Sequence, residues 1–209
     1  MKEKLSGYYR VLPYRWVTVV FLFMLIILNG INMSFYTPIL VQISESYGVS
    51  LGNFQLFFVI YFLLYPVTTF TIFKYVSDKY GPYACVMAGT MFVLTGTLMR
   101  CLLNVIFYPF MVIGFVFTGI SQPFLNNLAA VTSINWFPLI ERPTATMLAS
   151  LGNTIGYTIG AIIPQYLISG SYPFKFRVYR ANIKEFFPCA IISLICLILY
   201  REKPPFPPA

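Results

Sequence analysis

Amide, hydroxyl and tyrosine side chains recur at helical spacing inside the apolar runs of this sequence. They form three sets: Asn29, Asn32 and Tyr36; Thr118, Gln122 and Asn126; and Ser150, Asn153, Thr154, Tyr157 and Thr158. Within each set, steps of three and four residues bring side chains to one face of a helix. Uncharged amides and hydroxyls can hydrogen-bond a small polar solute, and aromatic ring faces can hold a quaternary cation without a counter-charge.

Two interpretations fit these polar faces. Polar side chains within a membrane usually face a bundle interior or a water-filled cavity, so the three faces together predict a substrate cavity. Alternatively, each residue makes a hydrogen bond between helices, which contributes roughly 0.6–2 kcal/mol. We favour the cavity for the set as a whole, and both interpretations stay open for each single residue. The candidate substrate-binding residues are Gln122, Asn29, Asn32, Tyr36, Asn126, Asn153 and Tyr157.

The residue types exclude several kinds of chemistry. The chain has no histidine, which excludes histidine acid–base catalysis and histidine-ligated metals. It has no Walker loop, and its four cysteines form no CxxC pair, so we expect them to be small core residues. No pair of carboxylates shares a helix face. We therefore predict no enzyme activity, no bound metal and no cofactor.

The carboxylates are expected outside the middle of the apolar spans. Glu45, Asp78, Glu141 and Glu185 fall at span ends or in loops. A proton-coupled carrier commonly needs a buried titrating carboxylate. The sequence therefore predicts facilitated movement of a solute, driven neither by protons nor by ATP.

Composition places the chain in the membrane. Of its 209 residues, 58% are hydrophobic and 10% are charged, whereas a soluble domain carries about 25% charged residues. The formal charge of +8 comes from basic residues that lie between apolar runs. Cytoplasmic loops of membrane proteins are enriched in such residues. We therefore expect the lipid bilayer as a partner, and no nucleic acid.

Six stretches are long and apolar enough to cross a membrane, since a span needs roughly 20 mostly apolar residues. They cover residues 16–39, 55–76, 83–103, 105–131, 144–168 and 184–200. Residues 1–15 form a basic N-tail, and residues 201–209 form a proline-rich linker. The early loop charges place both termini in the cytoplasm, with the plasma membrane as the default location. The basic loop 174–184 then falls outside and conflicts with this orientation.

The six spans can also be interpreted as two inverted repeats of three helices, an arrangement common in transporter halves. The predicted fold class is therefore an all-α membrane protein with six transmembrane helices as 3+3 repeats.

The fifth predicted span has small residues at a spacing of four: Gly152, Gly156 and Gly160, followed by Pro164. Glycines at this spacing make a flat groove, which lets another helix backbone approach closely. We expect span five to pack tightly against a helix, which could be one of a second half, of a second copy or of a partner. Pro164 should bend its outer end.

Residues Asp78-Lys79-Tyr80-Gly81 lie between the second and third predicted spans. An acid near a helix end can pair with an arginine or a helix N-terminus, and glycine allows a tight turn. This segment resembles the cytoplasmic loop signature of the major facilitator superfamily, although Lys74 stands where the first glycine of that signature is expected.

A denser resemblance covers residues 121–164. Gln122-Pro123-Phe124, Trp136-Phe137 and the run from Glu141-Arg142 to Thr146 resemble the solute-carrier family that includes the feline leukaemia virus subgroup C receptors. The resemblance implies a major facilitator fold, of which this chain corresponds to the N-terminal six-helix half. It also implies transport of choline or ethanolamine, or of haem.

The same resemblance implies roles for two residues. Gln122 matches a polar contact in the choline pocket of the family, and Met33 stands where the family has a tryptophan wall. Met33 offers an apolar contact in place of the ring. The candidate gating or structural residues are Asp78, Lys79, Gly81, Glu141, Arg142, Gly152, Gly156, Gly160 and Pro164.

Two functions remain open. In the first, the chain carries a small polar or cationic organic solute by alternating access, together with a second six-helix half, as a homodimer or with a partner carrier. In the alternative, it is a truncated membrane protein without transport activity that associates with a partner protein or a full-length carrier.

Overall fold

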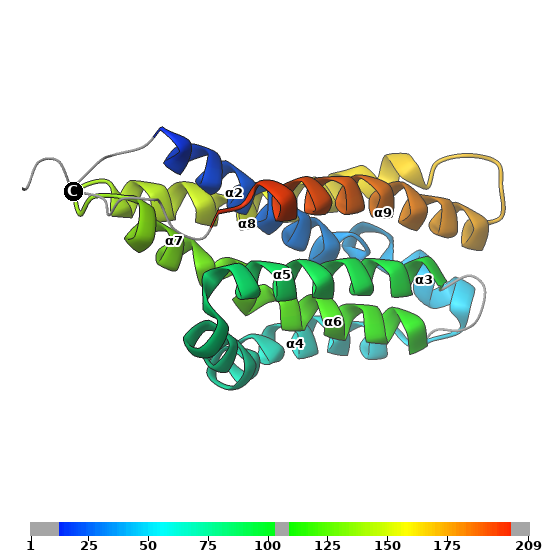
Figure 1. Ribbon diagram of the computed structural model, residues 1–209. Helices are drawn as coiled ribbons and strands as arrows, with labels where there is room; N and C mark the ends of the chain where they lie inside the picture. Colours follow the sequence, from blue (N-terminus) through cyan, green and yellow to red (C-terminus); the bar gives the residue numbers. More distant parts are fainter. Residues whose placement is uncertain (1–12, 103–108, 202–209) are drawn as a thin grey trace, which may run out of the picture.

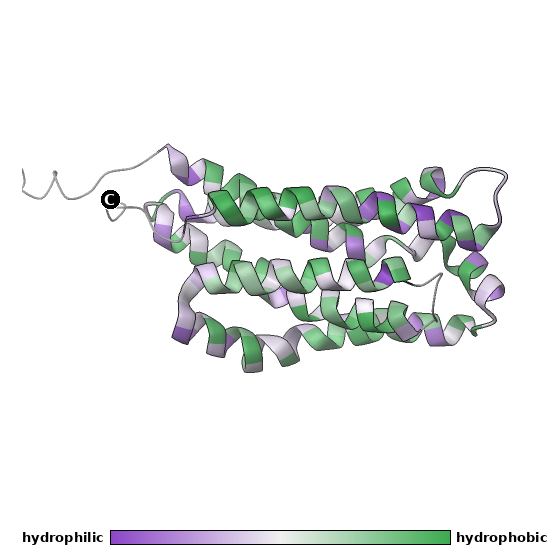
Figure 2. Ribbon diagram, turned by 45° about the vertical axis from the view of Figure 1, so that its right-hand side comes forward, coloured by the Kyte–Doolittle hydropathy of each residue, from purple (hydrophilic) through white to green (hydrophobic). Residues whose placement is uncertain are grey.

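The computed structural model describes residues 13–102 and 109–201, and the regular structure in these ranges is entirely helical. Within these two ranges, five helical stretches are long and apolar enough to cross a membrane. These are Tyr14–Tyr47, Leu51–Cys101, Pro109–Trp136, Arg142–Leu167 and Phe174–Leu199. The helices lie roughly side by side (Figure 1), and hydrophobic residues dominate their middle parts (Figure 2). The predicted all-α membrane fold is confirmed.

The first stretch is longer than predicted and is broken once. Helix α2 (Tyr14–Ser34) is followed by a short 3-10 helix, η1 (Thr37–Ile39), and by α3 (Leu40–Tyr47). Pro38 lies in η1 and has no N–H to continue the α-helical hydrogen bonds. Gly48 ends α3 with a φ of 67°, a left-handed conformation that favours glycine.

The second stretch contains a turn. Helix α4 (Leu51–Thr68) continues through a π-helix, η2 (Thr69–Phe73), into α5 (Lys74–Cys101). Gly81 interrupts α5 with φ 80° and ψ 179°, and Pro82 begins the next turn. Figure 1 shows the chain reversing there, so that α5 runs back beside α6. The predicted spans 55–76 and 83–103 lie on either side of this turn, and the count of six crossings stays a prediction.

The third stretch divides into α6 (Pro109–Asn126) and α7 (Leu128–Trp136), and α8 follows as Arg142–Leu167. Helix α8 does pack tightly against a helix, but that helix is α2 of the same chain. A Cβ atom added at Gly152 would lie 2.7 Å from the Phe23 carbonyl oxygen, and one added at Gly30 would lie 2.8 Å from the Asn153 carbonyl oxygen. The glycine face is therefore already occupied and offers no groove to a second half or copy.

The last helix begins earlier than predicted. Helix α9 spans Phe174–Leu199, directly after Pro173. The predicted loop 174–184 is thus wrong, because Lys175, Arg177 and Arg180 lie within the helix. An apolar window cannot detect such turns, since lysine and arginine are good helix formers but lower the mean hydropathy.

Candidate functional site

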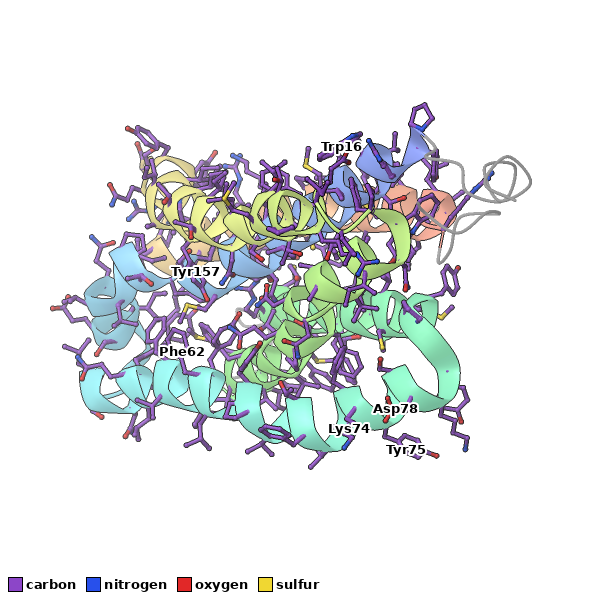
Figure 3. All side chains as sticks on the ribbon, turned by 90° about the vertical axis from the view of Figure 1, so that its left-hand side faces the viewer. Trp16, Phe62, Lys74, Tyr75, Asp78 and Tyr157 are labelled. Carbon is purple, nitrogen blue, oxygen red and sulfur yellow. The ribbon has the colours of Figure 1, made fainter. Side chains whose placement is uncertain are left out.

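A hollow of about 490 Å³ lies between α4, α6 and α8. Its lining residues are Phe62, Tyr65, Gln122, Asn126, Ser150, Asn153 and Tyr157. Figure 3 shows Phe62 and Tyr157 projecting from α4 and α8 toward the space between these helices. Four of the sequence-predicted residues therefore meet here: Gln122, Asn126, Asn153 and Tyr157.

The lining is polar and uncharged. The Gln122 side-chain nitrogen lies 3.5 Å from the Tyr157 hydroxyl. The carbonyl oxygens of the Gln122 and Asn153 side chains are buried and accept no hydrogen bond. A buried acceptor without a donor is costly, at about 1–3 kcal/mol. Both residues line the hollow, so each brings to it a side-chain acceptor that has no donor among the described residues.

Helix α4 supplies two aromatic walls that the sequence reading missed. The Tyr65 hydroxyl donates to the Asn127 side-chain oxygen at 2.6 Å, and the Asn127 amide lies 3.4 Å from the Thr69 hydroxyl. This chain of contacts links the π-helix η2 to the junction of α6 and α7, and it fixes Tyr65 at the hollow. Helix α4 carries apolar and aromatic residues on all sides, so no periodicity singled out Phe62 or Tyr65.

The structure places Asn29 behind the hollow and fully buried. Its amide nitrogen donates to the Ser121 hydroxyl at 2.6 Å and to the Thr118 carbonyl at 3.2 Å, and its oxygen accepts from the Tyr61 hydroxyl at 2.9 Å. Asn29 thus links α2 to α4 and α6 by hydrogen bonds. For this residue, hydrogen bonding between helices is the correct interpretation, rather than a place in the substrate cavity.

Asn32 and Tyr36 belong to a different centre, built around Arg100. Arg100 of α5 is fully buried, and one of its terminal nitrogens lies 3.0 Å from the Glu185 carboxylate of α9. The other donates to the Asn32 carbonyl at 2.9 Å, and the guanidinium also contacts the Asn32 side-chain oxygen. Asn182 joins the centre, because its amide donates to the Arg100 carbonyl and its oxygen accepts from the Tyr36 hydroxyl, each at 2.8 Å.

This centre corrects the expectation that no carboxylate lies within a span. Glu185 is the twelfth residue of the 26-residue helix α9, and its side chain is 4% exposed. Sequence reasoning assigned Glu185 to a span end because the predicted sixth span began at residue 184, and it gave no role to Arg100 of the third predicted span. The sequence did contain one indication of this pair, because a positive and a negative residue each lie within an otherwise apolar stretch. Met33 is buried beside Asn32 and does not line the hollow.

The gating candidates lie at one end of the bundle. Glu141, just before α8, pairs with Arg15 of α2 at 3.0 Å, and the Arg15 guanidinium lies over the rings of Trp16 and Phe137. Arg142 donates to the Phe137 carbonyl at 3.0 Å. These contacts join the start of α2 to the α7–α8 connection.

Asp78, Lys79 and Gly81 form the turn described above. The Lys79 amine donates to the Tyr75 hydroxyl at 2.9 Å, and hydrogen bonding to Tyr75 and Tyr80 raises the pKa of Lys79. Within 13–102 and 109–201, Asp78 forms no ion pair. Lys74, Tyr75 and Asp78 lie on the segment that leads into the turn (Figure 3). Pro164 lies inside α8 and is buried.

Residues 22–209 match the family model of the Major Facilitator Superfamily. The chain belongs to this superfamily. It is 22% identical to the choline/ethanolamine transporter FLVCR2 of Rattus norvegicus and 24% identical to FLVCR1 of Felis catus, and each alignment covers 93% of this chain and 36% of the relative. The solute carrier family 49 member 4 homolog of Xenopus laevis is 25% identical, over 96% of this chain and 47% of that protein.

Among solved structures, the chain is similar to an inward-facing, unoccupied bacterial homolog of the human lysosomal transporter Spinster. The TM-score is 0.69 and the identity 18%, over 92% of this chain and 44% of that one. The predicted membership of the major facilitator superfamily is confirmed, and the FLVCR transporters are among the relatives to which the chain is similar. The chain is an integral, multi-pass membrane protein of the major facilitator superfamily, and it spans about a third of the length of the FLVCR relatives it matches.

Proposed function

We propose that this chain forms one half of a carrier for a small polar or cationic organic solute. The observation that supports this most is the hollow between α4, α6 and α8. It combines two unsatisfied amide oxygens with aromatic rings and has no charged residue in its lining. Relatives named as choline/ethanolamine transporters support the same proposal. They do not favour the alternative of a truncated protein without transport activity.

The lining favours a quaternary or primary ammonium over an anion. The rings of Phe62, Tyr65 and Tyr157 can each hold a cation by cation–π attraction, worth about 0.5–2 kcal/mol. They take the place of the tryptophan that Met33 replaces. Haem carries two carboxylates, and the hollow offers no cation to meet them. Choline and ethanolamine therefore fit the lining better than haem.

Movement of the solute needs a second wall, because the hollow is open toward one side. We propose alternating access between this bundle and a second six-helix half. The carboxylate of Glu185 is occupied by Arg100 and lies outside the hollow. Facilitated transport, down the solute gradient, remains the proposed mode.

Substitution of Gln122 tests this proposal. Membranes containing the chain are equilibrated with radiolabelled choline and ethanolamine, and uptake is measured in cells that express it. The ammonium of ethanolamine can donate to the Gln122 side-chain oxygen, and a lost hydrogen bond to a charged partner costs about 1.5–3 kcal/mol, so Gln122→Ala should weaken ethanolamine binding about tenfold or more. Choline has no N–H and can donate only through its neutral hydroxyl, so its binding should weaken less, by about 0.5–1.5 kcal/mol. Gln165→Ala is the matched control, because Gln165 is an exposed amide on α8 that does not line the hollow.

An equal loss of solute binding in Gln122→Ala and Gln165→Ala would mean a general effect on folding. Unchanged binding in Gln122→Ala, with folded protein at normal levels, would remove Gln122 from the site. No specific binding of either solute by the wild-type chain would refute the proposed substrate class.

A further inference from the structure

The first turns of α9 carry four cations without acidic partners. Lys175, Arg177, Arg180 and Lys184 all precede Glu185, whose carboxylate pairs with Arg100. None of the four forms an ion pair within the described ranges. Three of them contact rings or backbone: Lys175 lies 4.9 Å from the Tyr47 ring, Arg180 lies 5.6 Å from the Tyr172 ring, and Arg177 donates to the Ile168 carbonyl at 2.7 Å. This end of the bundle therefore has an excess of positive charge.

An apolar hollow of about 210 Å³ lies directly beyond these cations, between α2, α8 and α9. Its walls include Ile27 and Ile31 of α2, Ile163 and Leu167 of α8, and Ile192 of α9. Lys184 and Glu185 line it as well. Met24 and Ile163 belong to its walls and have 40% and 41% of their surfaces exposed. The hollow therefore opens toward the surroundings of the bundle, which are lipid in a membrane.

The cations and the hollow share a face of α9. Arg177, Arg180 and Lys184 stand at i, i+3 and i+7, and Pro188 and Ile192 continue the same face at steps of four. Along this face the side chains are cationic up to Lys184 and apolar beyond it. A second, more polar hollow of about 310 Å³ lies at the cationic end and includes Arg177, Gln42 and Gln165.

We propose that this face of α9 binds a phospholipid with an anionic headgroup. The phosphate lies at the cations from Arg177 to Lys184, and one acyl chain fills the apolar hollow between α2, α8 and α9. Basic residues at the rim of a groove between transmembrane helices attract anionic headgroups, each contributing about 1 kcal/mol near the membrane surface. The Glu185 charge does not oppose the headgroup because Arg100 neutralises it.

The site is separate from the proposed solute hollow and does not rest on it. Ile163 and Leu167 share the face of α8 that packs on α2, whereas Asn153 and Tyr157 face α4 and α6. A free anion alone would leave the apolar hollow unfilled. A neutral lipid alone would leave Arg177, Arg180 and Lys184 without an anionic partner.

Native mass spectrometry of the purified chain in detergent tests the site, with dioleoyl phosphatidylglycerol and dioleoyl phosphatidylcholine as ligands. We expect the anionic lipid to bind at least about tenfold more tightly than the zwitterionic one. The triple variant Arg177→Gln, Arg180→Gln, Lys184→Gln should bind both lipids equally. The matched triple variant Lys74→Gln, Lys79→Gln, Arg201→Gln removes the same charge elsewhere and should keep the preference.

A second pair of variants tests whether an acyl chain occupies the apolar hollow. Ile163→Trp fills the hollow and should reduce the binding of both lipids, whereas Ile162→Trp, at the neighbouring exposed position, should not. Equal binding of the two lipids by the wild-type chain would overturn the proposal. So would displacement of the lipid by inorganic phosphate, or an unchanged preference in the first triple variant. Native-like circular dichroism of each variant confirms that it is folded.

Discussion

At the scale of single residues, Arg100 and Glu185 form the centre on which the polar interior depends. Arg100 joins α5 to α2 through Asn32 and to α9 through Glu185. Asn32 also accepts a hydrogen bond from the Thr97 hydroxyl at 2.8 Å. Removing one charge would leave the other buried and unpaired, which is far more costly than removing both.

Arg100→Met should therefore lower stability by about 3–5 kcal/mol, whereas Arg100→Met combined with Glu185→Met should recover most of the loss. The measurement is the thermal unfolding midpoint of the purified chain in detergent. Lys74→Met is the control, since Lys74 is exposed and forms no ion pair with a described residue. A single variant as stable as wild type, or a double variant less stable than the single, would contradict the role of this pair.

The sequence indicated which polar residues mattered, but not to what each one is bound. Periodicity placed Asn29 and Asn153 equally well on inward faces. Only the assembled bundle shows that Asn29 has three hydrogen-bond partners from other helices, while the side-chain oxygen of Asn153 has none. A helical face fixes the direction of a side chain within its own helix, whereas its partner depends on packing between distant segments.

At the scale of helices, α2 and α8 meet along their backbones. The Cβ of an alanine at Gly156 would clash with the Ile27 carbonyl oxygen and lie 3.0 Å from the Gly30 Cα. Backbone atoms on both sides leave no flexible side chain to move away. The close approach of the α2 backbone therefore requires glycine on this face of α8.

Gly156→Ala should destabilise the chain by about 1–3 kcal/mol, because it overpacks this contact. Gly52→Ala should be neutral or stabilise by up to about 1 kcal/mol, since nothing lies within 4 Å of the added Cβ and alanine is the better helix former. Unfolding midpoints measured side by side check the pair. A neutral Gly156→Ala would show that α2 and α8 can separate without cost.

Helix positions were predictable where apolar runs were long, and less so where charge or backbone breaks intervened. The turn at Gly81 agrees with the sequence, because only glycine readily adopts its φ of 80°. The start of α9 was misplaced by ten residues, since its first turns are basic. The first span was predicted to end at residue 39, whereas the helical chain continues through η1 into α3 and ends at Tyr47.

At the scale of the whole molecule, the two ends of the bundle differ in charge and in chemistry. The Gly81 turn and the Arg15–Glu141 pair are proposed to lie at the cytoplasmic end. The connection at residues 168–173 and the basic start of α9 would then lie at the opposite end. All four cysteines are buried, so the native chain should react little with a thiol reagent outside the membrane.

Single cysteines should therefore report the orientation. Ser171→Cys, which is exposed in the α8–α9 connection, should react with a membrane-impermeant maleimide in intact cells. Lys79→Cys, which is exposed near the Gly81 turn, should react only after permeabilisation. The reversed pattern would place the N-terminus outside. Labelling of both positions in intact cells would mean that they share one side of the membrane.

The pairing of Arg100 with Glu185 also sets an order for biosynthesis. The two residues are 85 positions apart, and a ribosome adds about 5–20 residues per second. Arg100 is therefore translated about 4–17 seconds before the carboxylate that will neutralise it. An unpaired arginine in hydrocarbon is costly during that interval, so we expect the C-terminal end of α5 to stay near the headgroups until α9 is inserted. Insertion of α9 thus allows α5 to reach its final depth in the membrane.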